Sequence, residues 1–309
     1  MTVSSTRTDS LSADEPAFLR RMGRMLLADK FALVAAVFLV VMVVLAIVGP
    51  AWLGEEALKQ NLRGRNLAPF DWSRDWFWWF GADALGRPLL ARIIVATQNT
   101  LLVAAGAVLI SAVIGTFLGL LAGFSSPRVS QAIMRLADVI MSFPSLLIAV
   151  IVLYLLGSSI LNLMLVLSIT RIPVYLRTTR AEVLEIRERM FVQAARVMGA
   201  SSRRILFRHI LPIVFPTLTT LATLDFAYVM LAESALSFLG IGIQPPDITW
   251  GLMISQGRQY LTNAWWLSFW PGLAIIFTTL SLNLLSNWLR IALDPTQRWR
   301  LEMRGETRG

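Results

Sequence analysis

The sequence predicts an all-α polytopic membrane protein with six transmembrane helices. Three observations lead to this fold class. The 309-residue chain is 56% hydrophobic and only 15% charged, whereas a soluble domain carries about 25% charged residues. Its mean hydropathy is +0.65. It also contains several uncharged runs that reach the roughly 20 apolar residues a helix needs to cross the hydrocarbon core of a bilayer.

The composition excludes several kinds of functional site. The chain has no cysteine and a single histidine, His209, which excludes disulfides, thiolate metal sites and multi-histidine metal centres. It contains no Walker loop and no zinc-protease or serine-hydrolase motif. We therefore expect no catalytic residues, no metal site and no cofactor in this chain. The net charge of +9 comes from arginines that flank apolar runs, which indicates membrane topology and no nucleic-acid partner.

The first two spans follow from uncharged runs. Residues 31–54 carry no charge and follow a basic segment, so they predict the first transmembrane helix. The polar stretch 55–97 predicts a loop whose tryptophans suit a membrane surface. Residues 98–124 are again uncharged and predict the second helix. Within that helix Gly115, Gly119 and Gly123 recur every fourth residue, which predicts close packing with a neighbouring helix.

The next uncharged run is too long for one span. The sequence Gly157-Ser158-Ser159 interrupts it and predicts two helices near 133–156 and 160–180. Pro144 predicts a kink in the first of the two. Residues 211–239 and 264–289 predict the fifth and sixth spans.

Three acidic residues lie in predicted spans: Asp138, Asp225 and Glu233. Ionisable groups at membrane depth generally face the bundle interior or a water-filled cavity. Two interpretations stay open: the carboxylates tie helices together, or they line a translocation path. Asp225 and Glu233 are separated by roughly 12 Å along an α-helix, too far to share a proton. A proton-coupled secondary transporter, in which such residues would carry the protons, is the alternative from another functional class.

The distribution of basic residues orients the bundle. Six spans place both termini on the same side. Twenty-one lysines and arginines fall in the two terminal tails and in segments 124–135 and 171–208, whereas seven fall on the opposite side. The positive-inside rule therefore predicts cytoplasmic N- and C-termini and a cytoplasmic segment 181–210.

That segment contains the most informative stretch of the chain, Gln193–Pro212. It carries four arginines and no acid, and such charges cannot lie in hydrocarbon. Its small residues offer a surface that another protein can approach closely, which is typical of a docking element.

The local pattern predicts two short helices at an angle. Residues 182–200 have charged residues on one side and an apolar side that includes Met190 and Val197. Gly199 can end this helix in a left-handed conformation. Ser201 or Ser202 can cap a second short helix, and Pro212 fits the start of the next span.

The same residues resemble the coupling signature of bacterial ATP-binding cassette (ABC) import permeases. That signature reads Glu-Ala-Ala, three residues, Gly, nine residues, Ile-x-Leu-Pro. It is present here as Gln193-Ala194-Ala195, Gly199 and His209-Ile210-Leu211-Pro212, with Gln193 in place of Glu and His209 in place of Ile. Further segments are similar to the second ("C"-type) permease subunit of the dipeptide/oligopeptide/nickel branch: GADALGRPLLAR at 81–92, MRLADVIMSFPSLLIAV at 134–150, RERMFVQAARVMGAS at 187–201, AESALSFLGIGIQPPDITWG at 232–251, PGLAI at 271–275 and ALDP at 292–295.

The resemblance implies a type I ABC importer permease fold in a bacterial inner membrane. A homologous second permease would complete the channel, two cytoplasmic subunits would bind ATP and Mg, and an extracytoplasmic binding protein would deliver di- or oligopeptides. Nickel, glutathione or another small solute is the alternative substrate. It also implies ATPase-coupling residues: Gln193, Ala194, Ala195, Met198, Gly199, Ala200, Ser201, Arg204, His209 and Pro212.

These expectations divide the chain into five parts. They are a cytoplasmic N-terminal segment, 1–30; the first transmembrane helix, 31–54; an extracytoplasmic loop, 55–97; a five-helix permease core, 98–292, that includes coupling helices at 187–210; and a cytoplasmic tail, 293–309.

Overall fold

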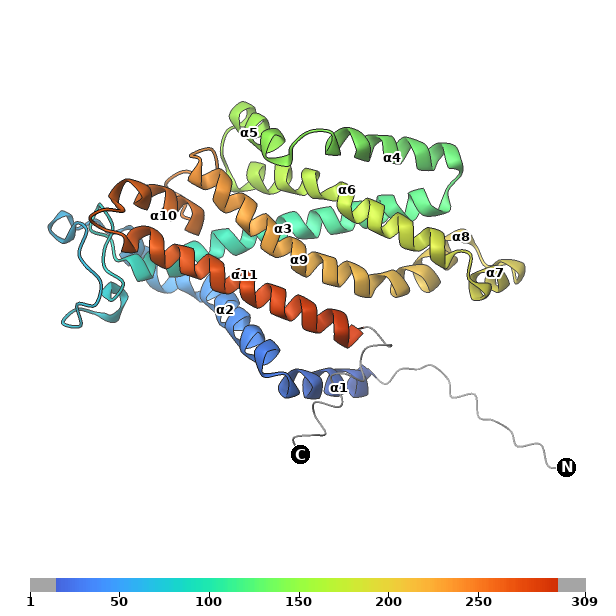
Figure 1. The fold of residues 1–309 in the computed structure, drawn as a ribbon, viewed down its shortest axis with the longest axis horizontal. Helices are drawn as coiled ribbons and strands as arrows, with labels where there is room; N and C mark the ends of the chain where they lie inside the picture. Colours follow the sequence, from blue (N-terminus) through green and yellow to red (C-terminus); the bar gives the residue numbers. More distant parts are fainter. Residues whose placement is uncertain (1–14, 294–309) are drawn as a thin grey trace.

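The computed structural model describes residues 15–293, and the side chains of residues 22–293. The described part of the chain is almost entirely helical, with one isolated β-bridge between Ala82 and Pro88 (Figure 1). The predicted all-α class is therefore confirmed. The basic residues of both tails beyond these limits, and the end of the ALDP segment, lie outside the described residues.

Within residues 15–293, five helices are long and apolar enough to cross a membrane, and a sixth span exists only if a bent pair is counted as one. The five are α2 (Lys30–Leu58), α3 (Leu89–Phe124), α6 (Ile160–Ile186), α9 (Leu211–Phe238, preceded by the continuous turns from Ser202) and α11 (Trp266–Leu293). The bent pair is α4 (Pro127–Met141) and α5 (Ser145–Leu156), whose axes differ by 81°.

The bend between α4 and α5 has a local cause. Pro144 occupies the N-cap of α5 with an extended backbone, and proline can neither donate a helical hydrogen bond nor fit beside the preceding turn. The predicted kink is confirmed, but the prediction of one continuous helix over 133–156 is wrong. α4 also begins earlier, at Pro127, where proline favours the first turn of a helix.

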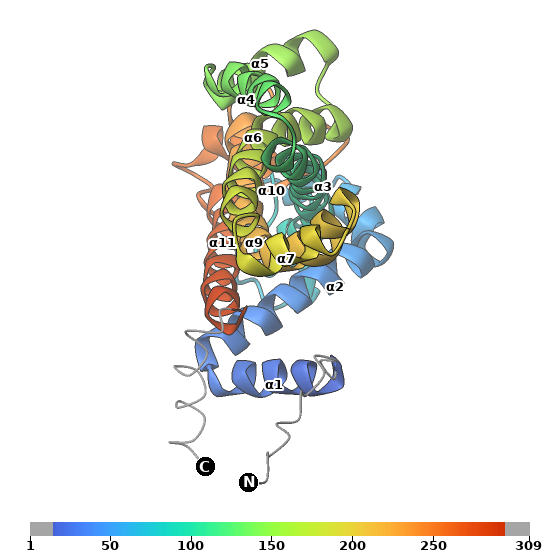
Figure 2. The same cartoon turned by 90° about the vertical axis from the view of Figure 1, so that its right-hand side faces the viewer.

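Helix α3 lies at the centre of the bundle and contacts α2, α4, α6, α9, α10 and α11 (Figures 1 and 2). Its glycines explain the close contact with α6. A Cβ atom added at Gly115 would lie 2.5 Å from the Cβ atom of Tyr175, and one added at Gly119 would lie 2.5 Å from that of Thr179. A Cβ atom added at Gly123 would lie 2.7 Å from the Cβ atom of Val183. The glycine ridge therefore lies where the two helices touch.

Several helices extend beyond the uncharged runs that predicted them. α3 begins at Leu89 instead of 98, because the charge of Arg92 is buried against Asp83 within the fold. α2 continues to Leu58 instead of 54 by burying Ala57 and leaving Glu55 exposed. α6 similarly runs on from 180 to 186, and α11 runs from 266 to 293 instead of 264–289. Charge alone therefore underestimates helix length where one helix face is buried.

The bundle has two structurally different ends (Figure 1). We call them the loop end and the hairpin end. The loop end holds residues 59–88, with the short turns η1 (Leu62–Gly64) and η2 (Trp76–Trp78), and α10 (Trp250–Gly257) with η4 (Arg258–Tyr260). The hairpin end holds α7 (Met190–Val197), α8 (Ser202–Arg204) and the π-helical turn η3 (Ile205–Ile210).

Aromatic side chains order the loop end. The ring of Phe80 stacks on Trp270 of α11 at 4.2 Å between centroids, and Trp72 meets Trp79 edge-on at 5.0 Å. Such ring pairs add to the burial of apolar area. The long loop is therefore held against α11 and does not project freely.

The first helix, α1 (Glu15–Ala28), precedes α2 at a sharp turn. Asp29 caps α2 by accepting hydrogen bonds from the backbone N–H groups of Phe31 and Ala32, each at 3.2 Å. Met25 packs in a small cluster with Trp288 of α11. α1 is thereby fixed beside the end of the last helix.

Candidate functional sites: a helical hairpin and buried ion pairs

The segment that carries the predicted docking element forms a helical hairpin, residues 187–210. Gly199 has a φ of +82°, the left-handed conformation expected where α7 stops. Ser201 has an extended backbone, and its hydroxyl accepts a hydrogen bond from the Arg204 N–H at 3.4 Å, so it caps α8. η3 then leads directly into α9. These local features agree with the sequence prediction.

The prediction of one helix over 182–200 is wrong. α6 ends at Ile186, and Arg189 has an extended backbone at the N-cap of α7. The side chain of Arg187 turns back and donates a hydrogen bond to the carbonyl oxygen of Gly123 at 2.9 Å. The break reorients α7, so that its inner face meets η3.

The inner face of the hairpin is a small apolar core. Val192 and Ala195 of α7 are buried against Ile205 and Ile210 of η3, in one cluster with Val183, Ile186, Tyr175, Leu120, Val214 and Leu218. Ala195 therefore points into the core of the hairpin and does not belong to its outer surface. This core attaches the hairpin to α6, α3 and α9 as one packed unit.

The outer face carries apolar side chains that nothing in the described chain covers. Met190 is 86% exposed, Val197 is 90% exposed and Met198 is 81% exposed. The helical pattern placed Met190 and Val197 on one apolar side of a single helix over 182–200, and that expectation is wrong because the helix breaks at 187–189. An exposed apolar patch bordered by charge is typical of a protein interaction site.

The other signature residues lie around this patch. Gln193 is exposed and donates a hydrogen bond to the carbonyl oxygen of Glu188 at 3.1 Å. The guanidinium of Arg196 lies 4.9 Å from the ring centre of Phe124 and connects the hairpin to the end of α3. The remaining members divide by exposure: Ala194, Gly199, Ser201, Arg204 and Pro212 are exposed, and Ala200 and His209 are half-buried.

The three acidic residues predicted within spans all have partners. Asp138 of α4 pairs with Arg177 of α6 at 2.6 Å. Asp225 of α9 is buried and pairs with Arg171 of α6. Glu233 is buried and accepts a hydrogen bond from the hydroxyl of its helical neighbour Ser237 at 2.8 Å. Within the described residues, no three acidic or histidine side chains come together as a metal site.

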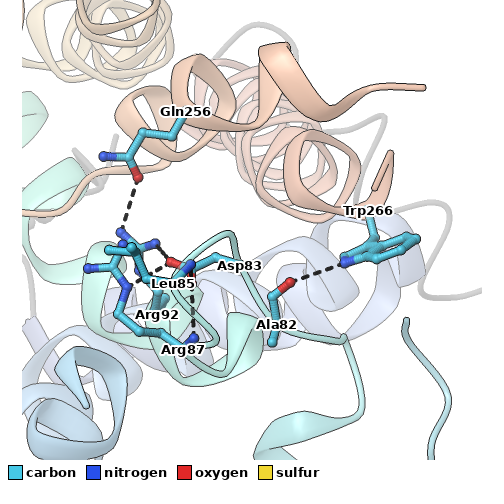
Figure 3. Close-up of polar contacts among 7 residues, drawn as sticks. All are labelled: Ala82, Asp83, Leu85, Arg87, Arg92, Gln256 and Trp266. Carbon is cyan, nitrogen blue, oxygen red and sulfur yellow. Dashed lines mark hydrogen bonds and ion pairs between the residues drawn. The ribbon is translucent and has the colours of Figure 1, made fainter. Parts of the chain in front are cut away.

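Sequence reasoning missed a second polar network, at the loop end (Figure 3). Asp83 accepts hydrogen bonds from the backbone N–H groups of Leu85 and Arg87, each at 2.9 Å, and from the Arg87 side chain at 2.7 Å. Arg92 also pairs with Asp83, and its second amino group donates to the Gln256 side chain of α10 at 3.3 Å. The four-residue spacing of Asp83 and Arg87, around Gly86, was the signal available in the sequence.

The network joins the loop, α3 and α10 around a cavity. Arg92 is almost fully buried, so removing its partner would cost about 3–5 kcal/mol. The cavity beside it measures about 300 Å³ and is lined by Arg87, Arg92, Gln256 and Tyr260 among others. Trp266 of α11 adds a contact between α11 and the loop, because its indole N–H donates a hydrogen bond to the carbonyl oxygen of Ala82 at 3.4 Å.

Two family models and one solved structure are similar to this chain. Residues 115–299 match the family model for the binding-protein-dependent transport system inner membrane component. Residues 17–69 match the N-terminal TM domain of oligopeptide transport permease C. The MetNI methionine ABC transporter, solved in inward-facing conformations, shares the fold with a TM-score of 0.53 at 17% identity, over 64% of this chain and 95% of that one.

Curated relatives are similar along most of the chain. The di/tripeptide transport system permease protein DppC of Pseudomonas aeruginosa is 38% identical, over 91% of this chain and 93% of its own length. The probable D,D-dipeptide transport system permease protein DdpC of Escherichia coli K12 is 35% identical, over 88% and 89%. The nickel transport system permease protein NikC of the same organism is 34% identical, over 84% and 92%. The chain therefore belongs to the family of binding-protein-dependent transport system inner membrane components.

Proposed function

We propose that this chain is one of two homologous permease subunits of an ATP-driven importer of di- and oligopeptides. The relatives named for di/tripeptide and D,D-dipeptide transport, at 38% and 35% identity, support a peptide substrate. In this proposal the second permease completes the channel, and a binding protein delivers the peptide outside the membrane. The chain itself carries no Walker loop, so two separate subunits bind ATP and Mg.

The observation that carries the proposal is the geometry of the hairpin. Its inner face is a packed core, and its outer face exposes Met190, Val197 and Met198. A rigid element with an uncovered apolar tip can bind in a cleft of an ATPase subunit. Because η3 continues into α9, movement of the hairpin would move α9 as a rigid body. ATP can drive such a change only if it favours one of the two channel states over the other.

The proposed function requires one orientation of the bundle across the membrane. The hairpin end and both termini lie in the cytoplasm of a bacterium, and the loop end faces the binding protein on the outer side of the inner membrane. The basic residues of the hairpin, Arg196, Arg203, Arg204 and Arg208, support this orientation.

The first experiment tests the docking face. We expect Val197→Asp and Met198→Asp to weaken binding of the ATPase subunits, because each places a charge at an apolar contact. The cost of a central interface residue, about 2–4 kcal/mol, corresponds to a loss of roughly 30-fold or more. Co-purification of the ATPase subunits and peptide-stimulated ATP hydrolysis by the reconstituted complex measure the effect. Both side chains are so exposed that the subunit itself should still fold.

Leu62→Asp serves as the matched control, because Leu62 is 68% exposed at the opposite end of the bundle. This variant should retain its ATPase subunits. Undiminished coupling in both hairpin variants would contradict the proposal. Uptake that requires ATP and survives collapse of the proton gradient separates this function from a proton-coupled transporter.

A further inference from the structure

A partly exposed polar patch lies near the middle of α6 and α9. Arg171 of α6 donates two hydrogen bonds to Asp225 of α9, and its guanidinium lies 4.3 Å from the ring centre of Tyr228. The hydroxyl of Tyr228 lies 3.3 Å from that of Ser145, at the first turn of α5. We call Arg171, Tyr228 and Ser145 the Arg171 patch.

The patch has a buried side and an open side. The side chain of Asp225 is 4% exposed and that of Arg171 is 18% exposed, whereas Tyr228 is 42% exposed. The carboxylate therefore lies behind the guanidinium, and the aromatic ring with its hydroxyl lies in front. The patch also adjoins the 81° bend between α4 and α5, because Ser145 follows Pro144 directly at the start of α5.

This surface is unsuited to contact with lipid. Asp225 lies fourteen residues after the start of α9 and thirteen before its end, which places the patch about 20 Å from either end of that helix. Charged and hydroxyl groups at such depth face a water-filled cavity or other protein, because hydrocarbon offers them no hydrogen bonds. An open face with these groups is therefore suited to an aqueous path.

We propose that the Arg171 patch is a contact site for the peptide in the translocation path, an inference that rests on the proposed function. The hydroxyls of Tyr228 and Ser145 can donate to and accept from the amide groups that every peptide carries. Asp225 is a positioning residue: it holds Arg171 and compensates its charge. Together with Asp225, the Arg171 patch then presents hydrogen-bonding groups without net charge to the translocation path, so that acidic, neutral and basic peptides pass it alike.

The role of the charge balance can be tested by removing the charge of Asp225, the partner of Arg171. Asp225→Asn leaves Arg171 as an uncompensated cation beside the path. The uptake ratio of Lys-Lys to Ala-Ala should then fall about tenfold, the size expected for one unscreened charge at a partly buried contact. Uptake is measured in proteoliposomes that hold the complete transporter, ATP and saturating binding protein. The double variant Arg171→Gln/Asp225→Asn removes both charges and should restore the wild-type ratio.

Two further variants complete the design. Asp71→Asn breaks an ion pair with Arg74 in the outer loop and should leave the ratio unchanged. Tyr228→Phe keeps the ring and removes the hydroxyl, so that KM should rise severalfold for all peptides while their ratio stays constant. This variant tests the patch even where Asp225→Asn does not accumulate in the membrane.

The outcomes separate the inference from the function on which it rests. An equal loss of uptake for all peptides in Asp225→Asn, without recovery in the double variant, would show a purely structural ion pair. An unchanged KM in Tyr228→Phe would overturn the contact site. ATP-independent uptake, or no peptide uptake by the wild-type complex, would instead overturn the proposed function.

Discussion

At the scale of single residues, the space around each glycine decides what it contributes. Gly115, Gly119 and Gly123 lie where α3 and α6 approach most closely, so any side chain there would overlap α6. Gly272 of α11 has no atom within 4 Å of the position that a Cβ atom would occupy. The same residue type therefore fixes helix packing in one helix and has no packing role in another.

A pair of matched substitutions tests this difference. In Gly119→Ala, the added methyl group would lie 2.7 Å from the carbonyl oxygen of Leu176. We expect overpacking to lower the free energy of unfolding by about 1–3 kcal/mol, more than the roughly 0.5–1 kcal/mol that alanine gains over glycine in a helix. Gly272→Ala should be neutral or slightly stabilising. Thermal unfolding of the purified protein in detergent measures both, and equal midpoints for the two variants would contradict the packing role.

At the scale of elements, arginines on α6 and at its C-cap hold the neighbouring helices by polar contacts. Arg171 binds α9, Arg187 binds the end of α3, and Arg177 and Arg180 bind α4. Helix α4 needs these contacts, because only Ser130 and Ala137 are buried along its fifteen residues. Its attachment to the bundle is therefore largely polar.

The double substitution Arg177→Gln/Arg180→Gln should loosen α4 selectively. Arg177 pairs with Asp138 at 2.6 Å, and the Nε atom of Arg180 donates to the Ser130 hydroxyl at 3.0 Å. Partly exposed pairs contribute up to about 1 kcal/mol, so we expect amide exchange in α4 to accelerate about fivefold while α3 keeps its protection. Hydrogen-exchange mass spectrometry resolves the two segments. Arg189→Gln is the control, since its partner Glu185 lies one turn away and not on α4; faster exchange in α4 there would argue against the assignment.

At the scale of the whole molecule, the long uncharged runs predict the approximate positions of the long helices α2, α3, α9 and α11. They failed wherever tertiary contacts neutralise a charge, as at Arg92, which pairs with Asp83 and lets α3 begin early. Helical periodicity failed at Met190 and Val197, because it assumes a continuous helix and the chain breaks at 187–189. Sequence alone also could not pair Arg171 with Asp225, because 54 residues separate them.

The orientation of the bundle gives the last prediction, and the absence of cysteine makes it simple to test. Ser73, in the 59–88 loop of the loop end, and Ser202, in the hairpin, are both exposed and lie at opposite ends of the bundle. If the hairpin end is cytoplasmic, Ser73→Cys should react with a membrane-impermeant maleimide in intact spheroplasts, whereas Ser202→Cys should react only after permeabilisation. The basic hairpin favours this orientation, because arginine-rich segments stay on the cytoplasmic side. The reverse labelling pattern would place the hairpin outside the cell, beyond the reach of any subunit that binds cytoplasmic ATP, and would contradict the proposed coupling.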